Sequence, residues 1–151
     1  MSLTNGGFEQ GVLLPWRDTG NVSLIKSSIG ARTGQYYVYM SARRFGTASI
    51  SQYINLRDVP RPTEGNYELI FFITRLTGFT DGRIVVSFSN YLGAPIIIPY
   101  DNIPYENKYF RFAYRIPMNG FRSSLTDLRI EINAGAESMA VRLDDVYFCP
   151  C

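Results

Sequence analysis

Apolar and polar residues alternate along most of this 151-residue chain. Successive side chains of a β-strand point to opposite faces of its sheet, so this alternation predicts half-buried strands. Turn-forming dipeptides such as Asp81-Gly82 and Asn119-Gly120 separate the alternating segments. We expect strands at residues 22–26, 35–42, 49–56, 66–75, 82–90, 94–98, 109–116, 127–134 and 139–149. About nine short strands with turns roughly every 10 residues predict an all-β protein, either an antiparallel β-sandwich or a barrel.

The segment 66–75 differs from the others because both of its faces are apolar or aromatic. Such a strand is expected in the middle of a sheet, with its second face covered or used for binding. The segment 123–132 also has helix-like apolar spacing, but its core, Arg129-Ile130-Glu131-Ile132, alternates and is β-branched, which favours a strand. No repeat or linker divides the sequence, so we expect one domain over residues 1–151.

Composition then excludes several kinds of chemistry. The chain has no His, which excludes catalytic triads built on His, an imidazole general base and His-ligated zinc. Its net charge of +2 is too small to indicate a nucleic-acid-binding surface. The longest apolar run, Leu69 to Ile73, is far below the roughly 18 residues of a membrane-spanning helix. We therefore expect neither a nucleic acid nor a membrane as partner.

Neither the two cysteines nor the N-terminus indicates a particular function. Cys149 and Cys151 are separated only by Pro150, which is awkward for a mutual disulfide, and without other Cys or His nearby they form an incomplete zinc site. Whether this tail links to another chain or is inert stays open. Met1 leads directly into fold-like sequence, with no segment that resembles a signal peptide.

Short motifs follow one another in a fixed order along nearly the whole chain. They are Asn5-Gly6-Gly7-Phe8-Glu9, Pro15-Trp16, Thr33-Gly34-Gln35-Tyr36, Ile50-Ser51-Gln52, Gly65-Asn66-Tyr67-Glu68-Leu69-Ile70-Phe71 and Asp144-Asp145-Val146. This ordered set resembles the carbohydrate-binding modules with a galactose-binding-like jelly roll, particularly the cellulose-, xylan- and laminarin-binding group found beside bacterial glycoside hydrolases. The set is more specific for the fold than for the ligand.

The resemblance implies a jelly-roll β-sandwich that binds a polysaccharide or oligosaccharide without cleaving it. It further implies an extracellular or cell-surface location, with the domain acting as part of a longer protein or as a homo-oligomer.

The resemblance also implies a structural calcium ion where the first and last strands meet. Its side-chain ligands would be Glu9 and Asp144, helped by carbonyl oxygens near Gly7 and in the turn 33–35. Oxygen atoms of these kinds are the ligands that Ca²⁺ prefers. Asp145 should alternate to the other face and is the weaker candidate. The alternative is that Glu9 caps a turn and Asp144 accepts backbone hydrogen bonds. We interpret Trp16 as a plug that closes one end of the sandwich rather than as a sugar platform.

Strand parity predicts a candidate sugar-binding face. Aromatic rings stack on the CH-rich faces of sugars, and polar side chains bond to the hydroxyl groups. Alternation points Phe72, Tyr37 and Tyr39 outward for stacking, and Arg111, Arg115, Arg129 and Glu131 outward for polar contacts. Several arginines on one face favour an acidic glycan. The sequence leaves open whether these residues share one sheet, and a one-residue register slip would reverse every assignment. In the resembled family the ligand lies across the sheet or at the rim formed by the loops.

Two other functions stay open. The same jelly roll serves as a structural or assembly subunit of a cell, spore or phage surface, which suits a short, Tyr-rich chain with a Cys-Pro-Cys tail. A small glycoside hydrolase or lyase would need two carboxylates about 5–9 Å apart in a cleft. No motif marks such a pair, so we expect a protein that is not an enzyme.

Overall fold

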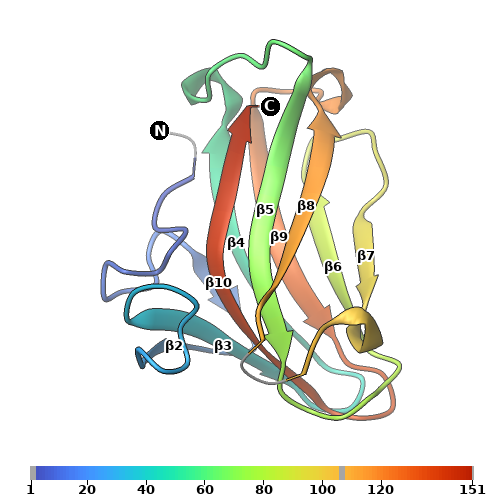
Figure 1. The fold of residues 1–151 in the computed structure, drawn as a ribbon. Helices are drawn as coiled ribbons and strands as arrows, with labels where there is room; N and C mark the ends of the chain where they lie inside the picture. Colours follow the sequence, from blue (N-terminus) through green and yellow to red (C-terminus); the bar gives the residue numbers. More distant parts are fainter. Residues whose placement is uncertain (1–2, 106–107, 151) are drawn as a thin grey trace.

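A computed structural model describes residues 3–105 and 108–150, and these residues form two five-stranded sheets packed face to face (Figure 1). Sheet A contains, in spatial order, β1 (Arg17–Thr19), β4 (Thr47–Asn55), β9 (Leu125–Asn133), β6 (Arg83–Phe88) and β7 (Ile96–Pro99). Sheet B contains β2 (Asn21–Lys26), β3 (Tyr36–Ala42), β10 (Met139–Pro150), β5 (Asn66–Arg75) and β8 (Phe110–Pro117). All neighbouring strands within these sheets run antiparallel. The predicted all-β sandwich is confirmed.

The strand that sequence analysis missed is β1, whose three residues are too few to show an alternation. The segment with two apolar faces is β5, which lies between β10 and β8 in the interior of sheet B, as predicted. The segment that could have been a helix is strand β9, paired with β4 and β6. Among the described residues, no helix is long and apolar enough to cross a membrane.

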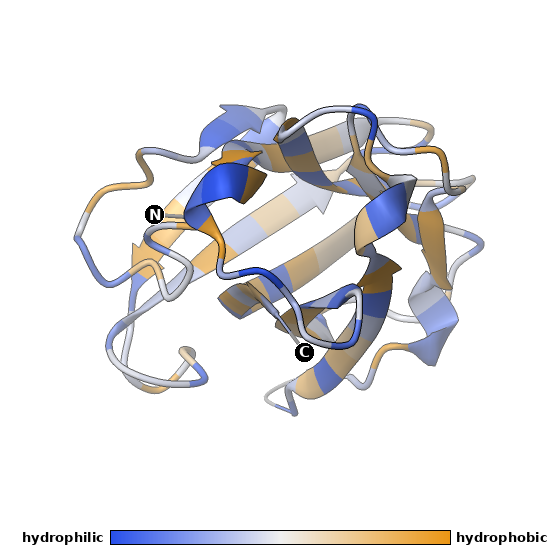
Figure 2. Cartoon of the chain, turned by 90° about the horizontal axis from the view of Figure 1, so that it is seen from above, coloured by the Kyte–Doolittle hydropathy of each residue, from blue (hydrophilic) through white to orange (hydrophobic). Residues whose placement is uncertain are grey.

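The core lies between the inner faces of the two sheets. Viewed from above, the strands alternate between apolar and polar residues along their length (Figure 2). Leu69, Phe71 and Ile73 of β5 are fully buried, opposite fully buried residues of sheet A such as Ile50 and Ile130. A large apolar side chain at such a site contributes about 1.5–3 kcal/mol through burial. The inward-facing residues therefore hold the two sheets together, and the outward-facing residues are available to contact solvent or a ligand.

The N-terminal segment completes this core. Trp16 is 1% exposed, its ring centroid lies 5.9 Å from that of Phe8, and its Nε1 donates to the Asn5 carbonyl at 2.9 Å. Trp16 is therefore a core residue and offers no surface to a sugar. At the other terminus, the thiol of Cys149 is half-buried and lies 3.8 Å from the Glu68 carbonyl oxygen, while Cys151 lies outside the described residues.

Candidate functional site

Five of the seven predicted binding residues share the outer face of sheet B. Phe72 of β5 lies opposite Arg111 of β8, and Arg115 lies further along the same strand. Tyr37 and Tyr39 of β3 point to this face because Val38 and Met40, which alternate with them, are buried in the core. The arginines Arg111 and Arg115 are exposed. The parity read from the sequence is correct for these three strands.

Arg129 and Glu131 do not belong to this face. They lie on β9, which pairs with β4 and β6 in sheet A, on the opposite side of the sandwich. Leu128, Ile130 and Ile132 point inward, so the predicted parity is correct for this strand as well. Whether all seven residues share one sheet was left open by the sequence, and the structure shows that they do not. A two-residue period shows which side chains leave the core, but it carries no information on which of two sheets a strand joins. The seven residues therefore do not form one site.

Two aromatic residues of the outer face, Phe72 and Tyr37, are covered by the loop between β2 and β3, residues 27–35. The guanidinium carbon of Arg32 lies 3.3 Å from the centroid of the Phe72 ring, and Phe72 is only 8% exposed. Tyr37 is equally buried beneath Gly30, where an added Cβ would lie 2.6 Å from the Tyr37 ring. Tyr39 is half-buried. Stacking of a sugar on Phe72 or Tyr37 would therefore require this loop to move.

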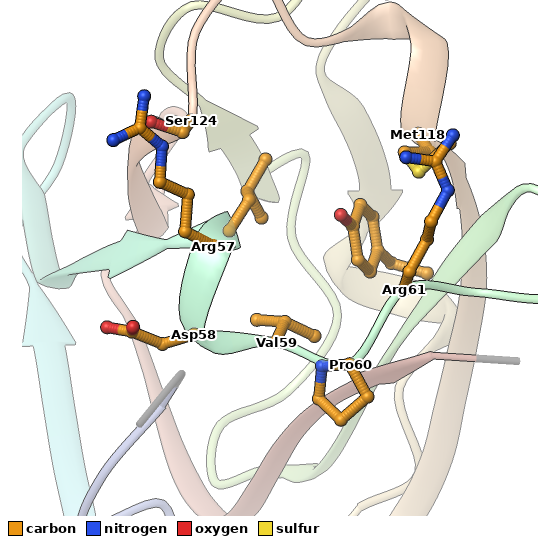
Figure 3. Close-up of a pocket in the computed structure, with 9 residues that line it drawn as sticks. Arg57, Asp58, Val59, Pro60, Arg61, Met118 and Ser124 are labelled. Carbon is orange, nitrogen blue, oxygen red and sulfur yellow. The ribbon is translucent and has the colours of Figure 1, made fainter.

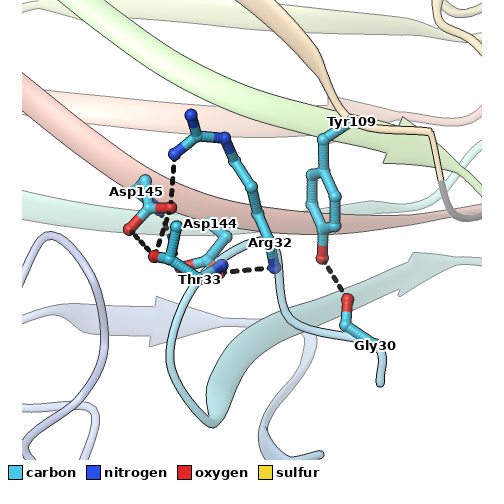
Figure 4. A network of polar contacts seen from close by, with 6 residues as sticks. All are labelled: Gly30, Arg32, Thr33, Tyr109, Asp144 and Asp145. Carbon is cyan, nitrogen blue, oxygen red and sulfur yellow. Dashed lines mark hydrogen bonds and ion pairs between the residues drawn. The ribbon is translucent and has the colours of Figure 1, made fainter. Parts of the chain in front are cut away.

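Two adjacent acids on β10 hold the loop down (Figure 4). The Asp144 carboxylate accepts the backbone N–H groups of Arg32 and Thr33 at 3.0 and 3.3 Å. The Asp145 carboxylate accepts the Thr33 hydroxyl at 2.7 Å and Arg32 Nη1 at 2.8 Å. The strand has a bulge between Asp144 and Tyr147, and Asp145 has a φ of 52°. Because a bulge breaks alternation, both carboxylates reach the same loop, and the prediction that Asp145 points to the other face is wrong.

This network concentrates charge in a buried place. Burial and then the charge of Asp145 raise the pKa of Asp144 to about 7, against the opposing effect of its backbone hydrogen bonds. Burial, followed by the charge of Asp144, raises the pKa of the Tyr109 hydroxyl, which donates to the Gly30 carbonyl at 2.7 Å and ties down the loop's other side. Both acids are less than 4% exposed, and Arg32 forms an ion pair with one of them.

The two carboxylates predicted to bind calcium contact different parts of the same loop. Glu9 accepts the backbone N–H groups of Gln35 and Tyr36, both at 2.9 Å, whereas Asp144 accepts those of Arg32 and Thr33. Over residues 3–105 and 108–150, no three His, Cys, Asp or Glu side chains gather closely enough to hold a metal ion. As placed, these side chains do not form a calcium cage. They match the alternative interpretation, in which both carboxylates accept backbone hydrogen bonds, and the calcium ion stays a prediction.

A groove of about 600 Å³ lies at the end of the sandwich where β5 begins (Figure 3). Arg57 and Arg61 stand on opposite sides of it. Tyr67 lines it but is 3% exposed, and burial raises the pKa of its hydroxyl while the charge of Arg61 acts in the opposite direction. The groove offers polar contacts, but its aromatic ring has no free face for stacking. Its lining residues are Leu56, Arg57, Asp58, Val59, Pro60, Arg61, Tyr67, Met118 and Ser124.

Sequence reasoning missed two arginines of the outer face of sheet B. Arg142 lies on β10, opposite Tyr39 on one side and Thr74 on the other. Parity would have placed it there, because Val141 and Leu143 are core residues. Arg32 lies in a loop, where side chains follow no regular alternation from which their direction could be predicted. We use the name arginine face for the set Arg32, Arg111, Arg115 and Arg142.

No family model matches the chain, and no curated protein matches it by sequence. Solved structures do match it. The carbohydrate-binding module TmCBM61, in complex with beta-1,4-galactotriose, has a TM-score of 0.74 at 20% identity, over 99% of this chain and 98% of that one. A carbohydrate-binding module specific for non-crystalline cellulose, CBM28, has a TM-score of 0.62 at 11% identity, over 100% and 96%. This chain therefore has the β-sandwich fold of carbohydrate-binding modules.

The same fold occurs in proteins of other kinds. The enzymatically active domain of tailspike protein 4 from bacteriophage CBA120 matches at a TM-score of 0.62 and 18% identity, over 98% of this chain and 21% of that one. A Stig cyclase from Fischerella also has the fold. At these identities the likeness establishes architecture alone, so function has to be argued from the surface.

Proposed function

We propose that this domain binds an acidic polysaccharide or oligosaccharide on its arginine face and does not cleave it. The observation that carries the proposal is the gathering of Arg32, Arg111, Arg115 and Arg142 around Phe72 and along β8, on one side of the sandwich. A guanidinium group presents two parallel N–H donors to a carboxylate or sulfate, which makes arginine suited to uronic acids and sulfated sugars. The fold shared with carbohydrate-binding modules supports a glycan as the source of those anions.

The two adjacent acids of this face, Asp144 and Asp145, support binding over hydrolysis, and its third acid, Glu68, lies opposite Arg115 on the neighbouring strand. A glycosidase needs two carboxylates that reach the scissile bond from either side. Asp144 and Asp145 are buried, and their oxygens bond to the β2–β3 loop. They act as anchors of the arginine face and are not free for a substrate.

Binding to polygalacturonate tests the proposal, with neutral β-1,4-galactan as comparison and titration calorimetry as the assay. Arg111→Ala combined with Arg115→Ala should weaken polygalacturonate binding at least tenfold, and added salt should weaken the wild type because exposed charges are screened. Arg129→Ala is the matched control, an exposed arginine on the opposite sheet. Equal loss in the control, or no binding to polygalacturonate, would overturn the proposal.

A structural or assembly role is the second candidate. It is an alternative that the sequence leaves open, and the same fold occurs as one portion of a phage tailspike. Mass measurement by light scattering after size exclusion separates the candidates: a stable oligomer that binds none of the glycans would support assembly, and a monomer that binds them would support the module.

A further inference from the structure

Two exposed aromatic rings flank a buried arginine where β5 ends, the end of that strand opposite the groove of Figure 3. Phe79, in the loop after β5, is 72% exposed, and Tyr105, which forms an isolated bridge with Arg75, is 48% exposed. The guanidinium carbon of Arg75 lies 4.4 Å from the Phe79 ring centroid and 4.9 Å from that of Tyr105. Two large rings thus remain in contact with water although the fold places them beside its own core.

Arg75 fixes the two loops that carry these rings. It is 8% exposed, its Nε donates to the Ile103 carbonyl at 2.8 Å, and its Nη1 donates to the Thr77 carbonyl at 2.6 Å. Two further bonds, from the Arg75 backbone N–H and from the Thr74 hydroxyl, reach the Pro104 carbonyl, both at 3.0 Å. A cation against an aromatic ring is attracted to the electron-rich face of that ring, which further holds the ring in place. The rings are consequently held in position before any ligand arrives.

Preorganisation of this kind favours recognition of a ligand. Ordering a flexible side chain on binding costs conformational entropy, and rings that are already fixed avoid most of that loss. Two accessible polar residues lie nearby: the exposed Asp101, whose carboxylate accepts the Thr80 N–H at 2.9 Å, and the half-buried Thr77, whose hydroxyl lies 2.8 Å from that of buried Tyr100. Two rings among polar groups are smaller than the contiguous apolar patch of a protein interface. They suit a small ligand with one apolar face and a polar edge.

We propose that Phe79 and Tyr105 form a second sugar subsite, which stacks the apolar face of an uncharged pyranose ring. This inference rests on the proposed function for its class of ligand and extends it: the arginine face binds the acidic groups of a glycan, and the ring pair binds neutral sugar units. The two subsites use different side chains and different forces. Experiments can therefore disprove either subsite without disproving the other.

Binding of neutral β-1,4-galactan and xylan oligosaccharides, followed by NMR saturation transfer and calorimetry, tests the inference. Phe79→Ala and Tyr105→Ala should each weaken neutral-sugar binding at least fivefold and leave polygalacturonate binding unchanged. The Arg111→Ala, Arg115→Ala variant should show the reverse. Tyr53→Ala is the matched control, since Tyr53 is 55% exposed and the guanidinium of Arg17 lies over its ring at 4.3 Å, but on sheet A.

The outcomes distinguish the two proposals. Neutral-sugar binding that survives both ring substitutions, that falls equally in Tyr53→Ala, or that is absent from the wild type overturns the second subsite. Neutral binding that depends on the rings, in a protein that ignores polygalacturonate, supports the subsite and rejects the acidic glycan alone.

Discussion

Removal of the Arg32 side chain should destabilise the domain, because two contacts depend on that one guanidinium. Arg32→Ala removes the ion pair with Asp145, whose side chain is 5% exposed, and the stacking on Phe72. It leaves intact the backbone N–H that Arg32 donates to Asp144. The variant therefore keeps the backbone path of the loop, but the buried carboxylate of Asp145 loses its positively charged partner.

The expected loss follows from these contacts. Removing one partner of a buried ion pair costs about 3–5 kcal/mol. The Arg32 side chain is 33% exposed, so water screens the pair and the lower end or less applies. Loss of the cation–π contact adds about 0.5–1 kcal/mol. We expect about 3 kcal/mol in total, which for a domain of this size lowers the melting temperature by roughly 6–12 °C.

Urea unfolding followed by circular dichroism measures this loss, provided that the slope of the transition is unchanged. Arg32→Lys keeps the charge but not the planar stack or the two-pronged donor, and should recover about half of the stability. Arg122→Ala, an exposed arginine elsewhere, should cost less than 0.5 kcal/mol, the usual range for surface changes. A loss below about 1 kcal/mol for Arg32→Ala, or full recovery by Arg32→Lys, would refute the reasoning.

Two further predictions concern the ends of the same loop. The calcium ion expected from the family resemblance predicts that a chelator lowers the melting temperature and that added Ca²⁺ restores it; an unchanged melting temperature would support the alternative, in which Glu9 and Asp144 only accept backbone N–H groups. Gly34 has a φ of 65°, and an added Cβ would lie 2.3 Å from Glu9 Oε1. Gly34→Ala should therefore cost roughly 1–3 kcal/mol through strain and a displaced carboxylate, measured by thermal unfolding against Gly78→Ala, whose Cβ would meet nothing within 4 Å.

The candidate surface shows where sequence reasoning succeeds. The outward direction predicted for Phe72, Tyr39 and Arg111 is correct because each lies in a regular strand. In such a strand, the apolar residues that point into the core show that the residues between them point outward. The same logic failed for Asp145, since the bulge in β10 inserts a residue that no period anticipates. It also failed to separate Arg129 from Arg111, because their strands have the same pattern and lie in different sheets.

The sequence by itself determined nine of the ten strands and their inward faces, because the burial of alternate side chains is visible in the residues of each strand alone. The alternation left a sandwich and a barrel open, and the family resemblance pointed to the sandwich. Only the tertiary structure decided which strands are neighbours, and hence which arginines share a face. It also decided that a loop closes over Phe72 and that Arg75 contacts the rings of both Phe79 and Tyr105. Loops and sheet partners are set by contacts between residues far apart in the chain, and such contacts leave no periodic trace in the sequence. Such long-range contacts bring together the residues of both surfaces that we propose to bind a glycan.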